Sequence, residues 1–392
     1  MKNADRRLLP DGIEEVLPPR AQHIEHLRRR LLDVMNTWGY DLVMPPVLEN
    51  IESLLTGAGQ DLDLRTFKVT DQLSGRMMGL SADTTPQVAR IDAHSLAPEG
   101  IGRFCYCRTV FHTRARSLLA SRTPTQIGAG LYGQAGVEAD VEVICLMLEM
   151  LSAAGVSDVH LDLGNVAVYR VVVEHFELEE AQKKELYELL SLKCRTDVRT
   201  WVEENALDAN ASEAIETLMS LQGDRSALMD SATRLSELVP ATAEELGHLM
   251  AVAELVEHRY PNTPICLDVT ELRGYQYHTG LVFGAYVPGY GDAVAQGGRY
   301  DETGAAFGRA RPARGFSADL RVLERLGAFS QDNTRVVVAP ADSKDDALWQ
   351  MVQTLRSQGV RVIAGRQEDV EQADCYLQLI NDQWQLVNKE PV

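Results

Sequence analysis

Residues 271–283 read ELRGYQYHTGLVF, with two strand-like ends around a middle that is too polar to lie in a core. The middle carries one fixed cation, two phenols and an imidazole: Arg273, Tyr275, Tyr277 and His278. Together these groups can hydrogen-bond a small zwitterionic molecule. The stretch therefore predicts either the wall of a ligand pocket or an ordinary hairpin whose Tyr and Arg side chains lie at its rim.

Strands are predicted on both sides of this stretch, at 264–271 and 280–287, because apolar residues dominate both segments. A third strand at 292–296 leads into the Gly-rich segment QGGRYD at 296–301. Two glycines followed by an Arg let the backbone approach a ligand while one side chain reaches across it. The segment GFSADLRVLERL at 315–326 is predicted as a helix that packs against these strands.

The N-terminal part predicts a helix at 20–40, followed by an extended segment at 40–49. The helix has apolar residues at steps of three and four: Ile24, Leu27, Leu31, Met35 and Trp38. The next segment is extended because Pro45 and Pro46 remove backbone donors and restrict the residues before them. Proline at such a place is typical of a sheet edge or an interface.

Residues 67–70 and 76–80 flank a turn and predict a β-hairpin. The hairpin leads to Asp-Thr-Thr-Pro at 83–86, a pattern typical of a helix start, with Asp or Thr as the cap and Pro in the first turn. Asp83 is therefore either a helix cap alone or a cap that also belongs to a ligand site.

Two further strands are predicted at 104–111 and 127–136, followed by a long helix. Gln134 and Glu138 lie four positions apart where the second strand meets this helix. If the strand continues to Glu138, alternation puts both side chains on one face. A buried carboxylate there needs a partner, either a bound ammonium or imidazolium group or a cation of the chain such as Arg273.

Residues 170–260 predict a helical insert, since they are rich in Glu, Ala and Leu and poor in proline. The insert has 19 acidic residues against nine Lys and Arg, so its surface is either plainly solvated or faces a partner. At 334–392 a strand, a helix and two strands predict a small α/β module. The chain is thus expected to divide into residues 1–328, which contain the insert, and this module.

The composition excludes several classes of protein. With 57 acidic residues against 38 Lys and Arg, the net charge is −19, which disfavours a nucleic-acid partner. No apolar run approaches the ~18–20 residues that span a bilayer, and the N-terminus lacks the apolar core of a signal peptide. A cytoplasmic location without membrane contact is expected. The six cysteines are scattered and form no CxxC pair, so we expect no metal, cofactor or disulfide.

Seven segments carry a resemblance to a known family: GYDLVMPPVLE, LSADTTPQVAR, GRFCYCRTVF, YGQAGVE, LRGYQYHTG, AQGGRYD and GFSADLRVLERL. In this order and spacing, over residues 10–328, they resemble the catalytic domain of histidyl-tRNA synthetase, a class II synthetase. The resemblance implies an α+β fold with an antiparallel sheet flanked by helices. It also implies a histidine pocket and dimerisation through the segment that contains Pro45 and Pro46.

The two signatures that bind ATP in class II synthetases depart from the family pattern. The second, written VFRxE, reads VFHTR at 110–114, so His112 replaces the Arg that meets the α-phosphate and Arg114 replaces the Glu near the adenine. The third, GFxxGLER, has Val322 where an Arg engages the phosphates. Loss of one charge-stabilising group commonly costs about 10²–10³ in rate. The departures therefore imply a chain that is not an adenylating enzyme.

The amino-acid pocket keeps its general polarity. By resemblance eight residues face histidine: Asp83, Thr85, Gln134, Glu138, Arg273, Tyr275, Tyr277 and His278. Gln276 and His278 depart from the RGLDYY of the synthetases, where an Asp and a Tyr stand.

LRGYQYHTG and DTTPQVAR are most similar to the synthetase-like regulatory subunits of ATP phosphoribosyltransferase. That resemblance implies a non-catalytic chain that activates a short catalytic subunit and mediates feedback inhibition by histidine at the first step of histidine biosynthesis. The C-terminal module resembles a trimmed anticodon-binding domain. Two alternatives stay open: a divergent class II ligase that activates histidine or a related amino acid with ATP, and a free-standing histidine sensor.

Overall fold

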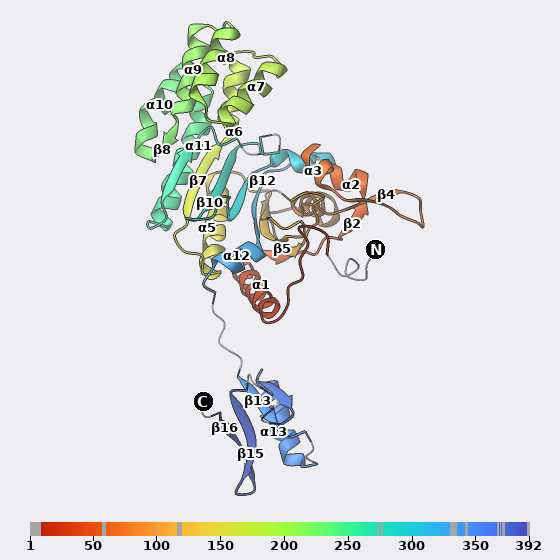
Figure 1. The fold of residues 1–392 in the computed structure, drawn as a ribbon. Helices are drawn as coiled ribbons and strands as arrows, with labels where there is room; N and C mark the ends of the chain where they lie inside the picture. The colour runs from red at the N-terminus through yellow and green to blue at the C-terminus, as the bar shows by residue number, and fades with distance from the viewer. Residues whose placement is uncertain are drawn as a thin grey trace. The chain divides into compact units, whose positions relative to one another are not determined.

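The computed structural model describes residues 9–56, 60–97, 99–115, 120–272, 274–275, 277–329, 335–341, 344–366, 368, 370 and 373–389. The chain forms two compact units, which divide between Phe329 and Ser330 (Figure 1).

A nine-stranded sheet organises the first unit, in the order β1-β5-β6-β12-β11-β10-β7-β9-β8. In that order the strands span Asp41–Leu42, Gly102–Thr109, Thr125–Tyr132, Ala313–Asp319, Ala295–Arg299, Leu281–Tyr286, His160–Asn165, Ile265–Asp268 and Gln222–Gly223. The pairs from β5 through β6, β12, β11 and β10 to β7 are antiparallel. The pairs β1–β5 and β7–β9 are parallel, so the sheet is mixed with an antiparallel centre.

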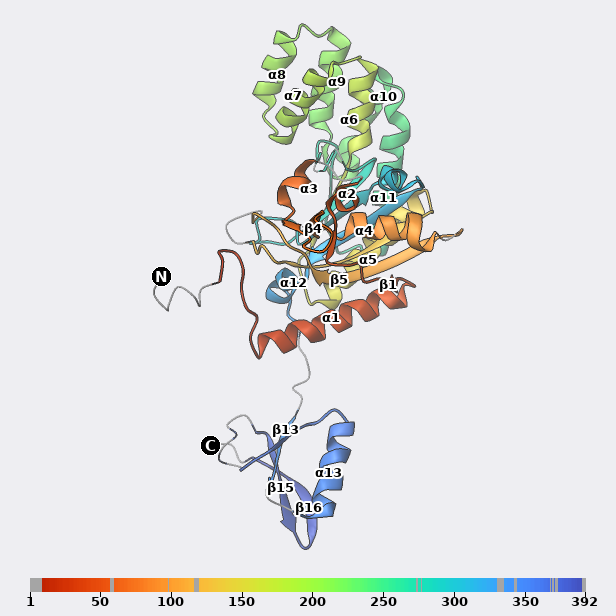
Figure 2. The ribbon, with the colours of Figure 1, turned by 90° about the vertical axis from the view of Figure 1, so that its right-hand side faces the viewer.

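One face of the sheet is covered by helices α1 (Arg20–Thr37), α5 (Val137–Ala153) and α11 (Thr242–Arg259), which share its largest apolar core (Figure 2). Strand β6 shows how the sequence divides the two faces. Its residues Ile127, Ala129 and Leu131 are buried in this core. Because successive side chains of a strand point to opposite faces, the residues between them lie on the other face.

A smaller sheet in the order β2-β4-β3 lies in the same unit. Its strands span Leu48–Asn50, Met77–Leu80 and Lys68–Thr70. The antiparallel pairing of β3 with β4 confirms the predicted hairpin. The short helices of this part are α2 (Ile51–Leu55), α3 (Gln60–Arg65), α4 (Thr85–Arg90), the π-helix Ile91–Leu96 and the 3-10 helix Asp301–Phe307.

The prediction of one helix over 315–326 is wrong for its first half. Strand β12 runs to Asp319, and helix α12 (Leu320–Leu326) begins only after it. The boundary has a local cause, because the Asp319 carboxylate accepts a 3.0 Å hydrogen bond from the Arg321 N–H and caps the helix. The strand has a tertiary cause, because it lies between β6 and β11 and pairs with both.

The condition that the second strand continues to Glu138 is not met, and the strand predicted to run to 136 ends earlier. Strand β6 ends at Tyr132, and helix α5 begins at Val137. Between them Gly133 and Gly136 have φ values of +82° and +97°, which turn the chain out of the sheet. Glu138 therefore lies in the first turn of a helix, where it is exposed.

The insert gathers at one end of the sheet, beside β7, β9 and β8 (Figure 1). Its helices are α6 (Val166–His175), α7 (Glu180–Ser191), α8 (Arg195–Glu204), α9 (Ala209–Ser220) and α10 (Arg225–Leu238), followed by α11. Helices α6, α7, α8 and α9 share a second apolar core. This core also contains Leu272 and Val282, which lie outside the insert. The insert is thus packed onto the very segment that carries the polar stretch at 271–283.

The second unit is a four-stranded sheet in the order β14-β13-β15-β16 with one helix on it. Its elements are β13 (Val336–Ala339), α13 (Asp346–Ser357), β14 (Arg361–Ala364), β15 (Cys375–Ile380) and β16 (Gln383–Asn388). Strand β16 was missed by the sequence interpretation. Its signal is the two-residue turn Asn381-Asp382, in which both residues have positive φ, as a tight hairpin requires. No helix in the described part of the chain is long and apolar enough to cross a membrane.

Candidate functional site

Two adjoining cavities lie against the sheet and share four of their lining residues. The His112 cavity, named for one of its lining residues, has a volume of about 680 Å³. The Tyr277 cavity has a volume of about 780 Å³. Four side chains line both: Asp83, Asp292, Gln296 and Ser317.

The floor beneath the cavities is a part of the sheet with two glycine-rich rows, of which Gly284, Gln296, Gly315 and Ser317 line a cavity. One row across β6, β12 and β11 reads Gly130, Gly315 and Gly298. The next row, which extends to β10, reads Gly128, Ser317, Gln296 and Gly284. Aromatic rings replace the missing side chains: a Cβ on Gly128 would lie 2.7 Å from the Tyr106 hydroxyl, and one on Gly298 would lie 2.7 Å from Nδ1 of His278. Glycine is required here because the rings lie directly on the backbone.

The wall of the Tyr277 cavity is aromatic. The Tyr277 ring lies 5.3 Å from the ring of Tyr300 and 5.2 Å from that of His278. Burial raises the pKa of Tyr277 well above its ordinary value, so the phenol is neutral. Burial lowers the pKa of His278 to about 4, so its imidazole is also neutral at pH 7. The wall therefore offers hydrogen-bonding groups without fixed charge.

Asp83 supplies the charge where the two cavities meet. Its Oδ1 accepts 2.9 Å hydrogen bonds from the Thr85 N–H and from the Gln126 side-chain amide. Thr85 Oγ1 in turn lies 3.3 Å from the Tyr106 hydroxyl. Asp83 is thus both the acceptor for the first N–H of helix α4 and a residue that lines both cavities.

The charges around the Tyr277 cavity favour a cationic group. Four carboxylates line it: Asp83, Asp162, Glu271 and Asp292. Two arginines, Arg65 and Arg114, also line it. A ligand that carries an ammonium group is therefore favoured over an anion.

Four of the eight residues predicted to face a ligand line this cavity: Asp83, Thr85, Tyr277 and His278. Tyr275 packs instead against Tyr169 of the insert. Gln134 and Glu138 line neither cavity. Gln134 lies in the loop before α5, and its carbonyl accepts a hydrogen bond from Arg314 of β12. Arg273 and Gln276 lie outside the described residues.

Several cavity residues were not found from the sequence: Gln126, Gln296, Tyr300 and Ser317. A signal for three of them was present. Gln126, Ser317 and Gln296 each stand two positions from a glycine of the floor, and positions two apart share a face of a strand. The sequence does not show that these positions share a cavity, because β6 lies more than 160 residues before β11 and β12 in the chain.

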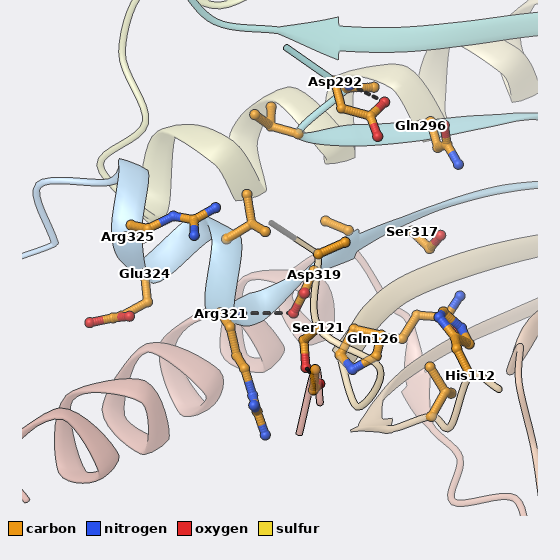
Figure 3. A pocket seen from close by; sticks show the side chains of 18 of the residues that line it. His112, Ser121, Gln126, Asp292, Gln296, Ser317, Asp319, Arg321, Glu324 and Arg325 are labelled. Atoms are coloured by element: carbon orange, nitrogen blue, oxygen red, sulfur yellow. Dashed lines mark hydrogen bonds between the residues drawn. The ribbon is translucent and has the colours of Figure 1, made fainter. Parts of the chain in front are cut away.

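The His112 cavity is lined by His112 and Val322, the two positions at which the resemblance to the synthetases leads one to expect an arginine, and Figure 3 shows the His112 side chain there. His112 is buried, with Nε2 2.9 Å from the carbonyl oxygen of Ala82, and Val322 lines the same cavity. Arg114 is exposed at the Tyr277 cavity.

Arginines from other positions also line the His112 cavity. They are Arg20, Arg321 and Arg325. Arg20 donates a 2.9 Å hydrogen bond to Glu324, Arg321 lies 3.3 Å from Glu14, and the Arg325 guanidinium lies 5.8 Å from the Tyr290 ring centre. The cavity is thus lined by three arginine side chains, and two of them, Arg20 and Arg321, are paired with carboxylates of the chain.

The sheet, the insert and the paired cavities define a protein of the class II synthetase type. The family profile described as Histidyl-tRNA synthetase matches residues 12–323. A solved histidyl-tRNA synthetase from Nostoc sp. PCC 7120 has the same fold, with a TM-score of 0.77, 20% identity and coverage of 95% of this chain and 91% of that one. The predicted α+β fold with a helix-flanked sheet is confirmed.

The C-terminal unit distinguishes this chain from the synthetases themselves. Residues 334–387 match the profile described as ATP phosphoribosyltransferase subunit HisZ C-terminal domain. An ATP phosphoribosyltransferase regulatory subunit from Ectopseudomonas mendocina is 50% identical over 98% of this chain and 99% of its own length. One from Azotobacter vinelandii is 49% identical over 99% of both. The solved ATP phosphoribosyltransferase regulatory subunit/histidyl-tRNA synthetase from Bacillus halodurans has a TM-score of 0.81 at 25% identity and covers 93% of this chain and 94% of that one.

The chain therefore belongs to the family of ATP phosphoribosyltransferase regulatory subunits. The resemblance found in the sequence is confirmed.

Proposed function

We propose that this chain is the non-catalytic regulatory subunit of an ATP phosphoribosyltransferase in the cytoplasm. It binds and activates a short catalytic subunit and transmits feedback inhibition by histidine at the first step of histidine biosynthesis. The observation that carries the proposal is the near-50% identity over nearly the whole chain, C-terminal unit included, to relatives of that name. The net charge of −19 supports a protein partner rather than a nucleic acid.

Histidine occupies the Tyr277 cavity in this proposal. Its α-ammonium group meets Asp83 and Thr85, and its imidazole lies against the neutral Tyr277 and His278 side chains. Arg273, which the sequence predicts to face the ligand, lies outside the described residues. The four lining carboxylates support a ligand that carries an ammonium group.

The absence of adenylation is supported by the His112 cavity. His112 and Val322 supply no fixed cation where the synthetases have arginines. Glu324 and Glu14 pair with two of the arginines that do line the cavity, so a triphosphate would have to compete with them. The alternative of a divergent ligase is not favoured by the names of the relatives.

Reconstitution tests the proposal. The chain is mixed with a short-form ATP phosphoribosyltransferase, and formation of the phosphoribosyl-ATP product is followed with and without histidine. We expect the mixture to be more active than the catalytic subunit alone and to be inhibited by histidine, because an effector acts through its different affinities for two states. Robust histidine-dependent ATP–pyrophosphate exchange by the chain alone would contradict a non-catalytic role.

Self-association is the second part of the proposal. Large apolar side chains are exposed around Pro45 and Pro46: Leu42, Met44, Val47 and Leu48. Side chains from the sheet and from α4 hold this segment. Arg108 Nη1 donates to the Pro45 carbonyl at 2.8 Å, and Gln87 Nε2 donates to the Pro46 carbonyl at 2.8 Å. A firmly held apolar strip of this kind is suited to a dimer interface.

Replacing Met44 with Arg should weaken the dimer about tenfold or more. Met44 is 80% exposed in the single chain, and a charge at the centre of an apolar interface would be buried without a partner. The molar mass across a dilution series, measured by light scattering, checks this. Leu192→Arg is the control, because Leu192 is 74% exposed but lies in the insert. Equal masses for Met44→Arg and the control would refute the interface.

A further inference from the structure

The turn that forms one wall of the Tyr277 cavity also contacts the helical insert. Tyr277 and His278 line the cavity. Tyr275 lies two positions before Tyr277 in the same turn, but its side chain points to the insert and not to the cavity. Its ring packs edge-on against Tyr169 of α6, with ring centres 5.3 Å apart. The same ring lies 5.3 Å from that of Tyr187 of α7. One turn thus supplies side chains to the cavity and to the insert.

Arg170 of α6 holds this turn at two points. Its Nη2 donates to the carbonyl oxygen of His278 at 2.7 Å and also donates to the carbonyl oxygen of Tyr275. Its guanidinium carbon lies 4.8 Å from the centre of the Tyr275 ring. Hydrogen bonds from a charged donor are stronger than neutral ones, so a single side chain of the insert holds the backbone at Tyr275 and at His278.

The insert also contacts the chain just before this turn. Lys193, between α7 and α8, forms an ion pair with the buried Asp268 at the end of β9. Asp268 Oδ1 accepts hydrogen bonds from the N–H and the hydroxyl of Thr270, at 3.0 and 2.8 Å. Leu272, which is fully enclosed, then joins the core of the insert. The insert therefore contacts this part of the chain at Asp268, Leu272, Tyr275 and His278.

We propose that Arg170 is a positioning residue for the effector cavity, and that helices α6 and α7 are energetically coupled to histidine binding through Arg170 and Tyr275. The inference rests on the proposed function, since it takes histidine as the occupant of the cavity. Histidine contacts Tyr277 and His278 only when their turn is in place, and that turn is held by α6 and α7. By linkage, histidine must then stabilise these two helices as much as they favour its binding.

Three variants test the coupling by calorimetry with histidine and by amide hydrogen exchange. Arg170→Met removes the donors and the cation, and Arg170→Lys keeps the charge on a shorter, non-planar group. The matched control is Arg195→Met, because the exposed Arg195 donates to the Met219 carbonyl within the insert, 3.0 Å away. We expect Arg170→Met to lose about tenfold in histidine affinity, Arg170→Lys to lose less, and Arg195→Met to be unchanged.

Hydrogen exchange separates positioning from general destabilisation. Saturating histidine should slow exchange in Glu180–Ser191 of the unmodified chain and of Arg195→Met, and this histidine-dependent slowing should be absent from Arg170→Met. The coupling is refuted if Arg170→Met binds histidine as tightly as the unmodified chain, or if it keeps the same slowing. If the unmodified chain binds no histidine, the proposed function fails first and this inference fails with it.

Discussion

Replacing Asp83 with Asn lowers the affinity of the chain for histidine about 30-fold or more. Losing one partner of a buried charge pair commonly costs about 2–5 kcal/mol. The substitution is chosen because both hydrogen bonds to the Asp83 carboxylate, from Thr85 and Gln126, end on Oδ1. An Asn keeps an oxygen there, so the start of helix α4 is retained and only the negative charge is removed. Isothermal calorimetry at pH 7.5 measures the effect.

Glu138→Gln provides the control for this experiment. It removes the same charge from an exposed side chain in the first turn of α5 that lines neither cavity. We expect its histidine affinity to equal that of the unmodified chain. If Glu138→Gln weakens binding while Asp83→Asn does not, the ligand lies elsewhere and the assignment of the Tyr277 cavity is wrong.

The second large effect is on stability. Asp140→Asn should lower the free energy of unfolding of the larger unit by about 3–5 kcal/mol, the usual cost of breaking a buried ion pair by removing one partner. Arg314 is only 1% exposed, and its Nε lies 2.6 Å from Asp140 Oδ1. The other oxygen of Asp140 lies 2.6 Å from Nε2 of His248. The substitution leaves the Arg314 charge buried without its counter-ion.

Urea unfolding followed by circular dichroism measures this loss. Arg199→Ala is the matched control, because it breaks a pair with Glu216 of similar length, 3.0 Å, whose side chains are 65% and 53% exposed. Exposed pairs contribute about 1 kcal/mol or less. An equal loss of unfolding free energy in the two variants would show that the buried Asp140–Arg314 pair contributes no more to stability than an exposed pair.

The buried pair also supports the cavities. Arg314 and Gly315 are neighbours in β12, so they point to opposite faces of the sheet. Gly315 lies in the cavity floor, while Arg314 holds Asp140 of α5 and the Gln134 carbonyl beneath it. Disturbing Asp140 should therefore also loosen the floor under the proposed histidine site.

Local pattern was sufficient for much of the fold. The period of the apolar residues located α1, the turn residues located the β3–β4 hairpin, and the ordered segments identified the family. Local pattern failed for β12, whose strand character depends on pairing with β6 and β11 on both sides. It failed also at the end of β6, predicted at 136, because the strand ends at Tyr132, before two glycines with positive φ.

For the candidate site, the sequence by itself determined which chemical groups are present. The Asp83–Pro86 start of a helix and the polar stretch at 271–283 supply the acid, the hydroxyl, the phenol and the imidazole that line the cavity. Only the tertiary structure decided which of these groups point to a common space. Tyr275 and Tyr277 are two positions apart in one turn, yet Tyr277 faces the cavity and Tyr275 contacts Tyr169 of the insert. The physical reason is that a turn has no fixed side-chain period, so its directions are set by Arg170 and the rings packed against it, which come from distant parts of the chain.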